Sequence, residues 1–378
     1  MRVCLVYDCL YPWTIGGAER WYRQMAEAHA AAGHSVTYLT MRQWDSGEEP
    51  ALPGVDVTAV GPRMALYADG RRRIAPPLAF GLGVLWHLLR HGRRYDVVHT
   101  ASFPFFSLLA AGLVRPLHGF RIAVDWHEVW TRAYWRQYLG KLGAVGWAVQ
   151  ALCARVPQIG FSFSRLHMVR AEALGVRNVT LLEGEYAGGA IAPQVAASRP
   201  LVLYTGRMIP EKRVPLLVDA LALLMRGDPQ LHAELIGRGP ELDAVRQRIA
   251  FHGLEERIAL PGFVDAAHLA ERQSTAAVLV QPSEREGYGM VVVESAARGV
   301  PVVVISGEDN AAVELVDEGE NGFIAGSADA VELAAAIGKA LASGEALRTR
   351  TRQWFAINQD RLSFAGSFQR IQARLQQR

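Results

Sequence analysis

The chain has 378 residues, half of them hydrophobic and a fifth charged, a balance typical of a folded globular protein rather than a disordered or fibrous one. One hydrophobic core rarely serves so long a chain, so two domains are expected. The net charge of +3 is unevenly placed: residues 1–185 hold 20 Lys and Arg against 14 Asp and Glu (+6), and residues 186–378 hold 20 against 23 (−3).

Several classes of protein are disfavoured at once. Met1-Arg2 leads directly into the strand-like VCLVYD, so no secretory signal is expected. The longest apolar stretch, residues 74–89, is interrupted by Pro76, Pro77 and His87, and is expected to be a buried helix rather than a membrane span. Three cysteines without metal-binding spacing favour a reducing cytosol.

The first half of the chain alternates short apolar runs with longer helical patterns, such as residues 18–33. This alternation predicts a parallel sheet covered by helices on both faces. The predicted strands lie at residues 2–8, 35–40, 55–60, 96–100, 121–127, 158–164 and 179–185.

Residues 186–199 are rich in Gly, Ala and Pro without periodicity, which predicts a linker. The strand–helix alternation then resumes, and residues 351–378 form an amphipathic helical tail. We therefore predict an α/β protein with two tandem doubly wound domains, residues 1–185 and 200–350. The predicted strands of the second domain lie at residues 200–206, 233–239, 257–263, 276–283 and 300–306.

Ligands of open α/β sheets bind at the carboxyl ends of the strands, so the cleft between the two domains is the expected site. Glu286 and Glu294 follow the strand at 276–283, and the glycines beside them favour a loop with a helix starting near Gly289. Two carboxylates flanking a helix start suit a ligand with hydroxyls at both ends and phosphate between them. By spacing alone, a capping carboxylate beside a surface acid is the favoured interpretation.

Arg207 and Lys212 follow the strand at 200–206 and belong to the same predicted sheet edge. The forked donors of arginine and the mobile charge of lysine together suit a diphosphate.

Taken together, these motifs resemble a retaining glycosyltransferase of family four with the GT-B fold, whose two Rossmann-like domains face a central cleft. Glu286 and Glu294 match the E-x7-E signature of that family, and the opening WTIGGAERW resembles its first glycine-rich loop. The motifs that carry the resemblance in the second half are Arg207 with Lys212, residues 236–241, 261–264, 282–303 and 321–325.

The resemblance implies that the tail helix of residues 351–378, around Trp354, crosses back onto the first domain. It also implies roles by position. Arg207 and Lys212 are expected to bind the diphosphate of a nucleotide sugar, Glu286 the sugar hydroxyls and Glu294 the ribose. The catalytic set is expected to be Glu286, His127, Arg207 and Lys212. The remaining residues of the expected donor site are Gly16, Gly17, Gly237, Phe263, Val264, Gly287, Tyr288, Gly289 and Met290.

His127 follows a strand end, where the family often has a histidine near the reacting sugar; a structural histidine paired with Asp125 or Glu128 is the alternative. His99 and Ser102 follow another strand and are weaker candidates. Tyr288 stands where the family usually has Phe, a departure that removes no needed group.

The expected reaction transfers a sugar from a UDP- or GDP-sugar to an acceptor hydroxyl with retained configuration. No Asp-x-Asp pair occurs in the sequence, so neither a metal nor another cofactor is expected. The alternatives are a nucleotide-sugar epimerase, a phosphorylase or a non-catalytic nucleotide-sugar-binding protein on the same fold. A dinucleotide dehydrogenase is disfavoured because the full G-x-G-x-x-G is missing.

The sequence indicates less about the acceptor substrate than about the donor. Residues 71–73, 92–94 and 130–150 mix cations with aromatic residues, and eight of the nine tryptophans lie in the first half. This composition suits an anionic membrane surface and a lipid-linked acceptor in bacterial polysaccharide or glycolipid synthesis. It also suits binding of a charged saccharide, or a core helix with exposed arginines. Nucleic acid is not an expected partner, and the expected location is cytoplasmic or peripheral on the inner membrane face.

Overall fold

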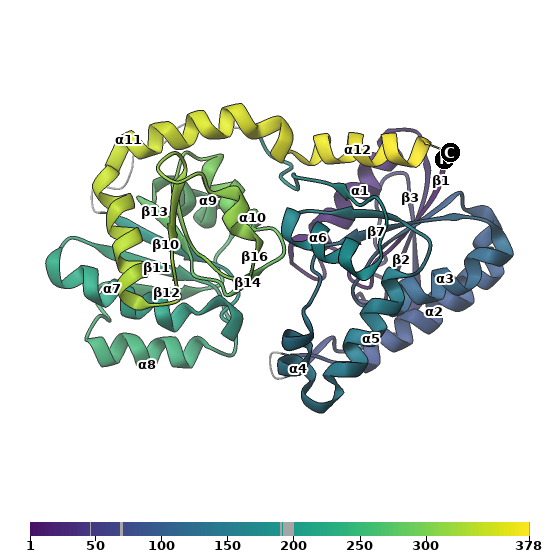
Figure 1. The fold of residues 1–378 in the computed structure, drawn as a ribbon, viewed down its shortest axis with the longest axis horizontal. Helices are drawn as coiled ribbons and strands as arrows, with labels where there is room; N and C mark the ends of the chain where they lie inside the picture. Colours follow the sequence, from purple (N-terminus) through teal and green to yellow (C-terminus); the bar gives the residue numbers. More distant parts are fainter. Residues whose placement is uncertain (46, 69–70, 190, 192–199, 378) are drawn as a thin grey trace. The chain divides into compact units, whose positions relative to one another are not determined.

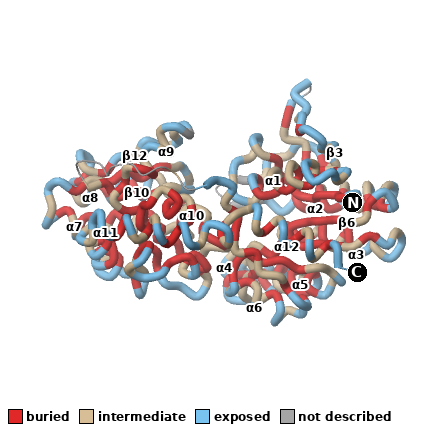
Figure 2. Tube along the Cα trace, turned by 90° about the horizontal axis from the view of Figure 1, so that it is seen from above, coloured by how far each residue is buried: buried red, intermediate tan, exposed pale blue. Residues whose placement is uncertain are grey.

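The computed structural model describes residues 1–45, 47–68, 71–189, 191 and 200–377 (Figure 1). The chain forms two compact units, one of Met1–Glu183 with Ser367–Arg378 and the other of Gly184–Gly366. In each unit the buried residues follow the strands, and the exposed residues lie on loops and outer helix faces (Figure 2). Among the described residues, no helix has the length and apolar character needed to cross a bilayer.

The first unit contains a seven-stranded parallel sheet in the order β3-β2-β1-β6-β7-β8-β9, which confirms the predicted architecture. Its central strands are buried on both faces, as the continuous apolar runs predict. The strands are β1 (Arg2–Val6), β2 (Ser35–Met41), β3 (Val55–Gly61), β6 (Val97–Ala101), β7 (Arg121–Trp126), β8 (Ile159–Ser162) and β9 (Thr180–Leu181), with a separate hairpin of β4 (Tyr67–Ala68) and β5 (Arg71–Arg72).

Helices cover this sheet, and α2 packs closely on its neighbours. A Cβ on Gly81 would lie 2.5 Å from the Phe106 Cβ, and one on Gly83 would lie 1.7 Å from the Val60 carbonyl oxygen. Small residues therefore let α2 contact both α3 and β3. The helices are α1 (Gly17–Ala31), α2 (Ala75–His91), α3 (Phe106–His118), α4 (Arg132–Leu139), α5 (Gly143–Ala154), α6 (Arg165–Leu174) and α12 (Phe364–Gln376), with short 3₁₀ turns η1 (Gly92–Arg94) and η2 (Gly140–Leu142).

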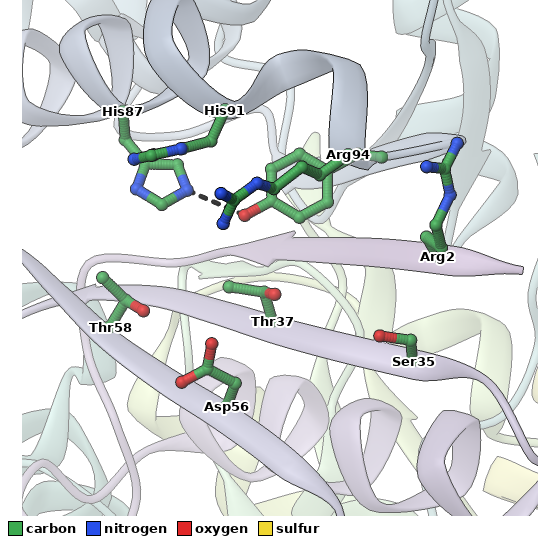
Figure 3. Close-up of a pocket in the computed structure, with 9 residues that line it drawn as sticks. Arg2, Ser35, Thr37, Asp56, Thr58, His87, His91 and Arg94 are labelled. Atoms are coloured by element: carbon green, nitrogen blue, oxygen red, sulfur yellow. Dashed lines mark hydrogen bonds between the residues drawn. The ribbon is translucent and has the colours of Figure 1, made fainter.

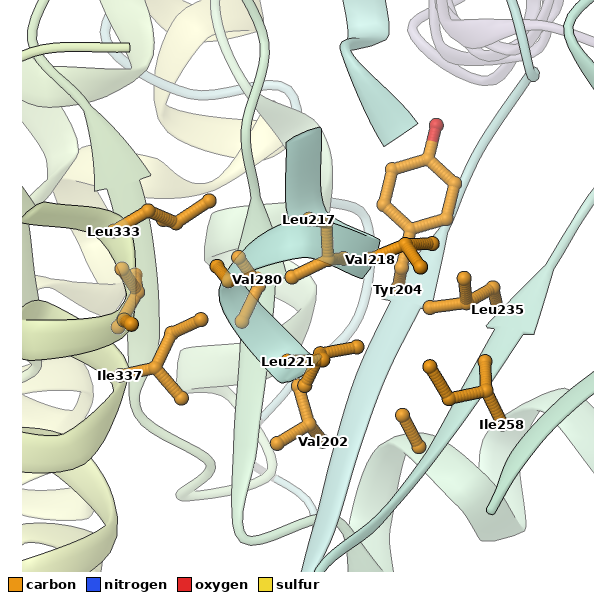
Figure 4. Close-up of a cluster of buried hydrophobic side chains, with 14 of the residues drawn as sticks. Val202, Tyr204, Leu217, Val218, Leu221, Leu235, Ile258, Val280, Leu333 and Ile337 are labelled. Carbon is orange, nitrogen blue, oxygen red and sulfur yellow. The ribbon is translucent and has the colours of Figure 1, made fainter. Parts of the chain in front are cut away.

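The second unit contains a six-stranded parallel sheet in the order β12-β11-β10-β13-β15-β17. Its core joins Val202 and Val280 of the sheet to Leu221 of α7 and Ile337 of α11 (Figure 4). The strands are β10 (Leu201–Thr205), β11 (His232–Ile236), β12 (Ile258–Gly262), β13 (Val278–Gln281), β15 (Val302–Ile305) and β17 (Gly322–Ala325), with a separate pair of β14 (Arg285–Glu286) and β16 (Asp309–Asn310). The helices are α7 (Val214–Gly227), α8 (Leu242–His252), α9 (Ala266–Thr275), α10 (Met290–Ala296) and α11 (Ala330–Leu362), with 3₁₀ turns η3 (Pro210–Lys212) and η4 (Ala311–Leu315).

The tail of the chain crosses to the first unit, but later than the expected crossing around Trp354. Trp354 is buried in the second unit, where its Nε1 donates to Asp317. Only the residues from Ser367 onward belong to the first unit, after a break between α11 and α12 at Ser363. Most of the predicted linker, residues 190 and 192–199, lies outside the described residues.

In the first unit α12 packs against α1. The Phe368 ring lies edge-on to the ring of buried His29, with centroids 4.9 Å apart. Nδ1 of His29 lies 2.8 Å from Nδ1 of His34. Burial, with smaller repulsion from His99, His34 and the amino terminus, lowers the pKa of His29 from 6.5 to about 3. His29 is therefore neutral in the folded chain at neutral pH.

This buried histidine predicts acid sensitivity of the first unit. The folded pKa of His29 lies below the unfolded value, so the unfolded state binds the proton first and stability falls as the pH drops from 6.5 towards 3. When the pH falls from 7 to 5, the unfolding free energy of the unaltered chain should fall by about 2 kcal/mol more than that of the His29→Gln variant. Denaturation followed by tryptophan fluorescence measures this; an unchanged pH slope, or an equal effect of His118→Gln, would contradict it.

Candidate functional site

In the second unit, the loops that follow the neighbouring strands β10 and β13 contact each other. The loop after β10 carries Lys212, and the loop after β13 carries Glu286. The Glu284 N–H donates to the Glu211 carbonyl (2.8 Å), and Arg213 forms an ion pair with Glu284 (3.1 Å). These contacts bring Lys212 beside Glu286.

The Glu286 carboxylate has several donors on a single oxygen. Its Oε1 accepts from Lys212 Nζ, from Gln281 Nε2 and from Ser283 Oγ, the last at 2.7 Å. The Lys212 and Glu286 side chains are 14% and 13% exposed, so water screens their attraction only weakly. Two residues expected to contact different parts of a donor are thus ion-paired to each other.

Sequence reasoning missed three residues that position Glu286. Gln281 and Ser283 are buried and donate to it directly. Asn310 is fully buried in β16, where its Nδ2 donates to the carbonyls of Ser283 (3.2 Å) and Ile305 (2.8 Å). The available signal was their position at the carboxyl end of β13, for Gln281 and Ser283, and in the loop region after β15, for Asn310.

The helix after Glu286 begins where the sequence predicts. Gly289 caps α10 with a φ of 109°, and a Cβ there would lie 2.8 Å from the Ala312 Cβ, so both conformation and space favour glycine. Tyr288 is buried, while Gly287 and Met290 are half-buried. Glu294 lies one turn into α10 and is half-buried. The two acids therefore belong to different local structures, a loop and a helix.

The other predicted donor residues of this unit follow neighbouring strands. A Cβ on Gly237 would lie 1.8 Å from the Gly206 carbonyl oxygen, so glycine permits the close approach of two loops. Arg207 follows Gly206 and is exposed. Phe263 and Val264 follow β12; Phe263 is 68% exposed and Val264 half-buried. The carboxyl ends of β12, β11, β10 and β13 thus carry the predicted set.

In the first unit, Gly16 and Gly17 stand at the start of α1, after β1. No neighbouring heavy atom lies within 4 Å of where a Gly17 Cβ would be. Packing among the described residues therefore does not require glycine at this position.

A buried polar cluster lies at the carboxyl end of β7. Asp125 accepts from Trp21 Nε1 (2.9 Å) and lies 2.8 Å from His99 Nε2. Burial alone raises the pKa of the Asp125 carboxyl, but the charge and hydrogen bond of His99, with His127 and Trp21, outweigh burial and hold that pKa below its usual range. Ser102 is buried beside the cluster, and its N–H donates to the Asp125 carbonyl (2.9 Å).

His127 belongs to the same cluster. It is half-buried, and its ring stacks on Phe163 with centroids 4.4 Å apart. Glu128, one of the two acids considered as its partner, accepts from Trp130 Nε1 (2.8 Å). The structure thus brings His127, His99 and Ser102 together around Asp125, an acid that sequence reasoning considered only as a partner of His127.

No group of three or more His, Cys, Asp or Glu side chains could hold a metal ion within the part of the chain that the structure describes. Cys4, Cys9 and Cys153 are buried, and none of them forms a disulfide within the described chain.

Comparison with known proteins matches both halves of the chain. A family model described as "Glycosyltransferase Family 4" matches residues 15–159, and one described as "Glycosyl transferases group 1" matches residues 192–354. A GDP-mannose:cellobiosyl-diphosphopolyprenol alpha-mannosyltransferase from Xanthomonas campestris is 27% identical over 94% of this chain and 92% of its own length. A GDP-mannose-dependent phosphatidylinositol monomannoside mannosyltransferase from Mycolicibacterium smegmatis is 29% identical over 42% of this chain and 44% of its own.

Solved structures share the fold at lower identity. The sucrose-phosphate synthase of Thermosynechococcus elongatus superposes with a TM-score of 0.81 at 20% identity, over 98% of this chain and 97% of that one. Anabaena Alr3699/HepE in complex with UDP superposes with a TM-score of 0.74 at 19% identity, over 99% of both chains. Since both halves match in sequence and the whole chain matches in fold, this chain belongs to the family-4-type glycosyltransferases with the GT-B fold.

Proposed function

We propose that the chain is a retaining glycosyltransferase that moves a sugar from a nucleotide diphosphate-sugar to an acceptor hydroxyl. The observation that carries the proposal is the pairing of Lys212 with Glu286 at the carboxyl ends of β10 and β13. A cation held beside a hydrogen-bond acceptor matches a nucleotide sugar, in which a diphosphate adjoins a hydroxylated ring.

In this proposal Arg207 and Lys212 bind the diphosphate and stabilise the charge that develops on it as the bond to the sugar breaks. Glu286 accepts hydroxyl groups of the sugar, beside the backbone N–H groups of Gly287 to Gly289. Glu294 accepts the ribose hydroxyls. The remaining residues of the proposed donor site contact the base or allow close approach of the ligand: Gly16, Gly17, Gly237, Phe263, Val264 and Met290.

The transfer step is proposed to retain the anomeric configuration, with attack from the face that the diphosphate leaves and the acceptor's proton passing to the departing phosphate. His127 is proposed to contact the reacting sugar. Asp125 is too deeply buried for such contact and instead positions His99 and Trp21 through hydrogen bonds.

The donor is proposed to be a UDP- or GDP-sugar. The names of two relatives specify GDP-mannose, and a structural neighbour was solved with UDP. Incubation with UDP-, GDP-, ADP- and dTDP-sugars, with and without EDTA, tests this by the nucleoside diphosphate released. Release from one donor, unaffected by EDTA and lost in Glu286→Ala, supports a metal-free transferase. An epimerised donor would favour the epimerase, and binding without turnover even with acceptors would favour a sensor.

Lys212 and Arg207 should each contribute to diphosphate affinity. Arg207→Ala or Lys212→Ala should weaken binding of the matching nucleoside diphosphate by about tenfold to a hundredfold, the range for one charge-assisted contact. Arg246→Ala removes an exposed arginine of the same unit and is the matched control. Calorimetric titration that gives equal affinities for all four proteins would contradict the diphosphate role.

Substitution of Glu286 should affect nucleoside diphosphate affinity and the rate of sugar transfer differently. Glu286→Gln removes the negative charge beside Lys212, so the nucleoside diphosphate alone should bind a few-fold more tightly, while sugar transfer or release falls by about a hundredfold or more. Comparing the nucleoside diphosphate Kd with kcat tests this split. Weaker diphosphate binding in Glu286→Gln would show that the carboxylate mainly holds Lys212 in place.

For the acceptor, we propose a lipid-linked hydroxyl compound reached by docking on an anionic membrane. The outer face of α2 exposes Leu78, Leu82, Trp86 and Leu89, and Arg90 lies over the Trp86 ring at 3.9 Å. The adjacent α3 exposes Leu113 and Leu117 (Figure 1). Residues 73–155 hold ten Lys and Arg against three Asp and Glu. Apolar side chains among cations fit an anionic bilayer surface, and a relative's name specifies a diphosphopolyprenol-linked acceptor.

Vesicle sedimentation tests the docking face. The double variant Leu82→Gln/Trp86→Gln should bind phosphatidylglycerol vesicles about tenfold more weakly, because two apolar side chains no longer enter the bilayer. Ile357→Gln alters an even more exposed apolar residue, on α11, and should bind like the unaltered chain. Absence of vesicle binding by the unaltered chain, or equal losses in both variants, would refute the docking face.

A further inference from the structure

A polar cavity lies in the first unit (Figure 3), and none of its lining residues belongs to the proposed donor site. Its volume is about 570 Å³. Arg2 and Ser35 line it at the starts of β1 and β2. Because these strands are parallel, the cavity stands at their amino ends, the edge opposite to that from which Gly16 and His127 follow.

Nitrogen-bearing side chains converge on one wall of the cavity. His87 and His91 lie one turn apart on α2, with ring centroids 4.9 Å apart, and Arg94 follows in η1. Among the described residues, no acid forms an ion pair with His91 or Arg94. Burial, with repulsion from His91 and Arg94, lowers the pKa of His87 from 6.5 to about 4. A positive charge on one of these groups therefore disfavours a positive charge on its neighbours, and a bound anion would relieve that repulsion.

Hydroxyl groups and one carboxylate form the facing wall. Ser35 and Thr37 come from β2, and Asp56 and Thr58 from β3 (Figure 3). Tyr95 also lines the cavity, and its hydroxyl lies 2.8 Å from His87 Nε2. A ligand that fills the cavity would therefore meet donors for an anionic group at one end and acceptors for hydroxyls at the other.

We propose that this cavity binds a small phosphorylated polyol, with its phosphate at Arg94 and His91 and a hydroxyl at Asp56. Arginine supplies forked donors that match phosphate oxygens, and the Asp56 carboxylate accepts hydroxyls but repels a second phosphate. The site is separate from the proposed donor residues and does not depend on their role. The phosphate comes either from a free metabolite or from a phospholipid headgroup, because both present the same chemistry.

Calorimetry with sn-glycerol 3-phosphate, which is also a lipid headgroup fragment, tests the proposal. The titrations use the full chain carrying Arg207→Ala and Lys212→Ala, so that the proposed diphosphate site cannot supply the signal. In this background Arg94→Gln should weaken binding by about tenfold or more, and Arg94→Lys by less, since a charged hydrogen-bond donor is lost or kept. Arg93→Gln changes an adjacent exposed arginine that does not line the cavity and should bind normally.

Asp56 and His91 give independent readouts if Arg94→Gln proves unstable. His91→Gln should weaken the binding of inorganic phosphate and of glycerol 3-phosphate alike. Asp56→Asn should weaken the binding of glycerol 3-phosphate but not that of inorganic phosphate. Saturable binding only to phosphatidylglycerol vesicles, lost in Arg94→Gln but kept in Arg93→Gln, assigns the phosphate to a lipid headgroup. No binding to either probe, or equal effects of Arg93→Gln and Arg94→Gln, overturns the proposal.

Discussion

Parallel strand pairing is the constraint on which the second unit's site depends. Because β10 and β13 are neighbours and run in the same direction, their following loops emerge at one edge. Backbone and ion-pair contacts between those loops then hold Lys212 and Glu286 in contact. A basic and an acidic residue 74 positions apart in the sequence form one chemical unit only because the sheet order makes their strands adjacent.

The ion pair also bears on how a ligand would enter. A half-buried charge is stabilised when its partner is near, so Lys212 and Glu286 satisfy each other in the unliganded chain. In the proposed donor complex, a diphosphate would compete with Glu286 for the lysine, and sugar hydroxyls would compete with the lysine for the carboxylate. The net free energy of donor binding would then be the favourable energy of the donor's own contacts less the energy of breaking this ion pair. Gln281 and Ser283, which donate to Glu286 in the unliganded chain, are placed to keep that carboxylate hydrogen-bonded during such an exchange.

Much of this organisation could be predicted from sequence because it depends on local patterns. Apolar runs between helical segments indicated both sheets, and glycine marked the start of α10 at Gly289. Asn310 could not be predicted, since its role arises from carbonyl groups that only the folded chain brings near. The short strand β17 was not among the predicted strands, because four residues beginning with glycine carry little periodicity. The chain passes to the first unit only after Ser363, where one helix ends and the next begins, and the amphipathic pattern from Trp354 onward did not indicate that break.

The placement of α12 has a consequence for the order in which the chain can fold during synthesis. Ile371 and Leu375 are fully buried, and Arg370 donates to the Leu181 carbonyl (3.0 Å), so residues after Ser367 complete the first unit. The ribosome makes them only after the whole of Gly184–Gly366. Domains generally fold as units as they emerge. Here all residues of the second unit are synthesised before the first unit is complete. Until α12 has been made, α1 lacks the helix that packs over it. The amino-terminal half is therefore the last to become fully native.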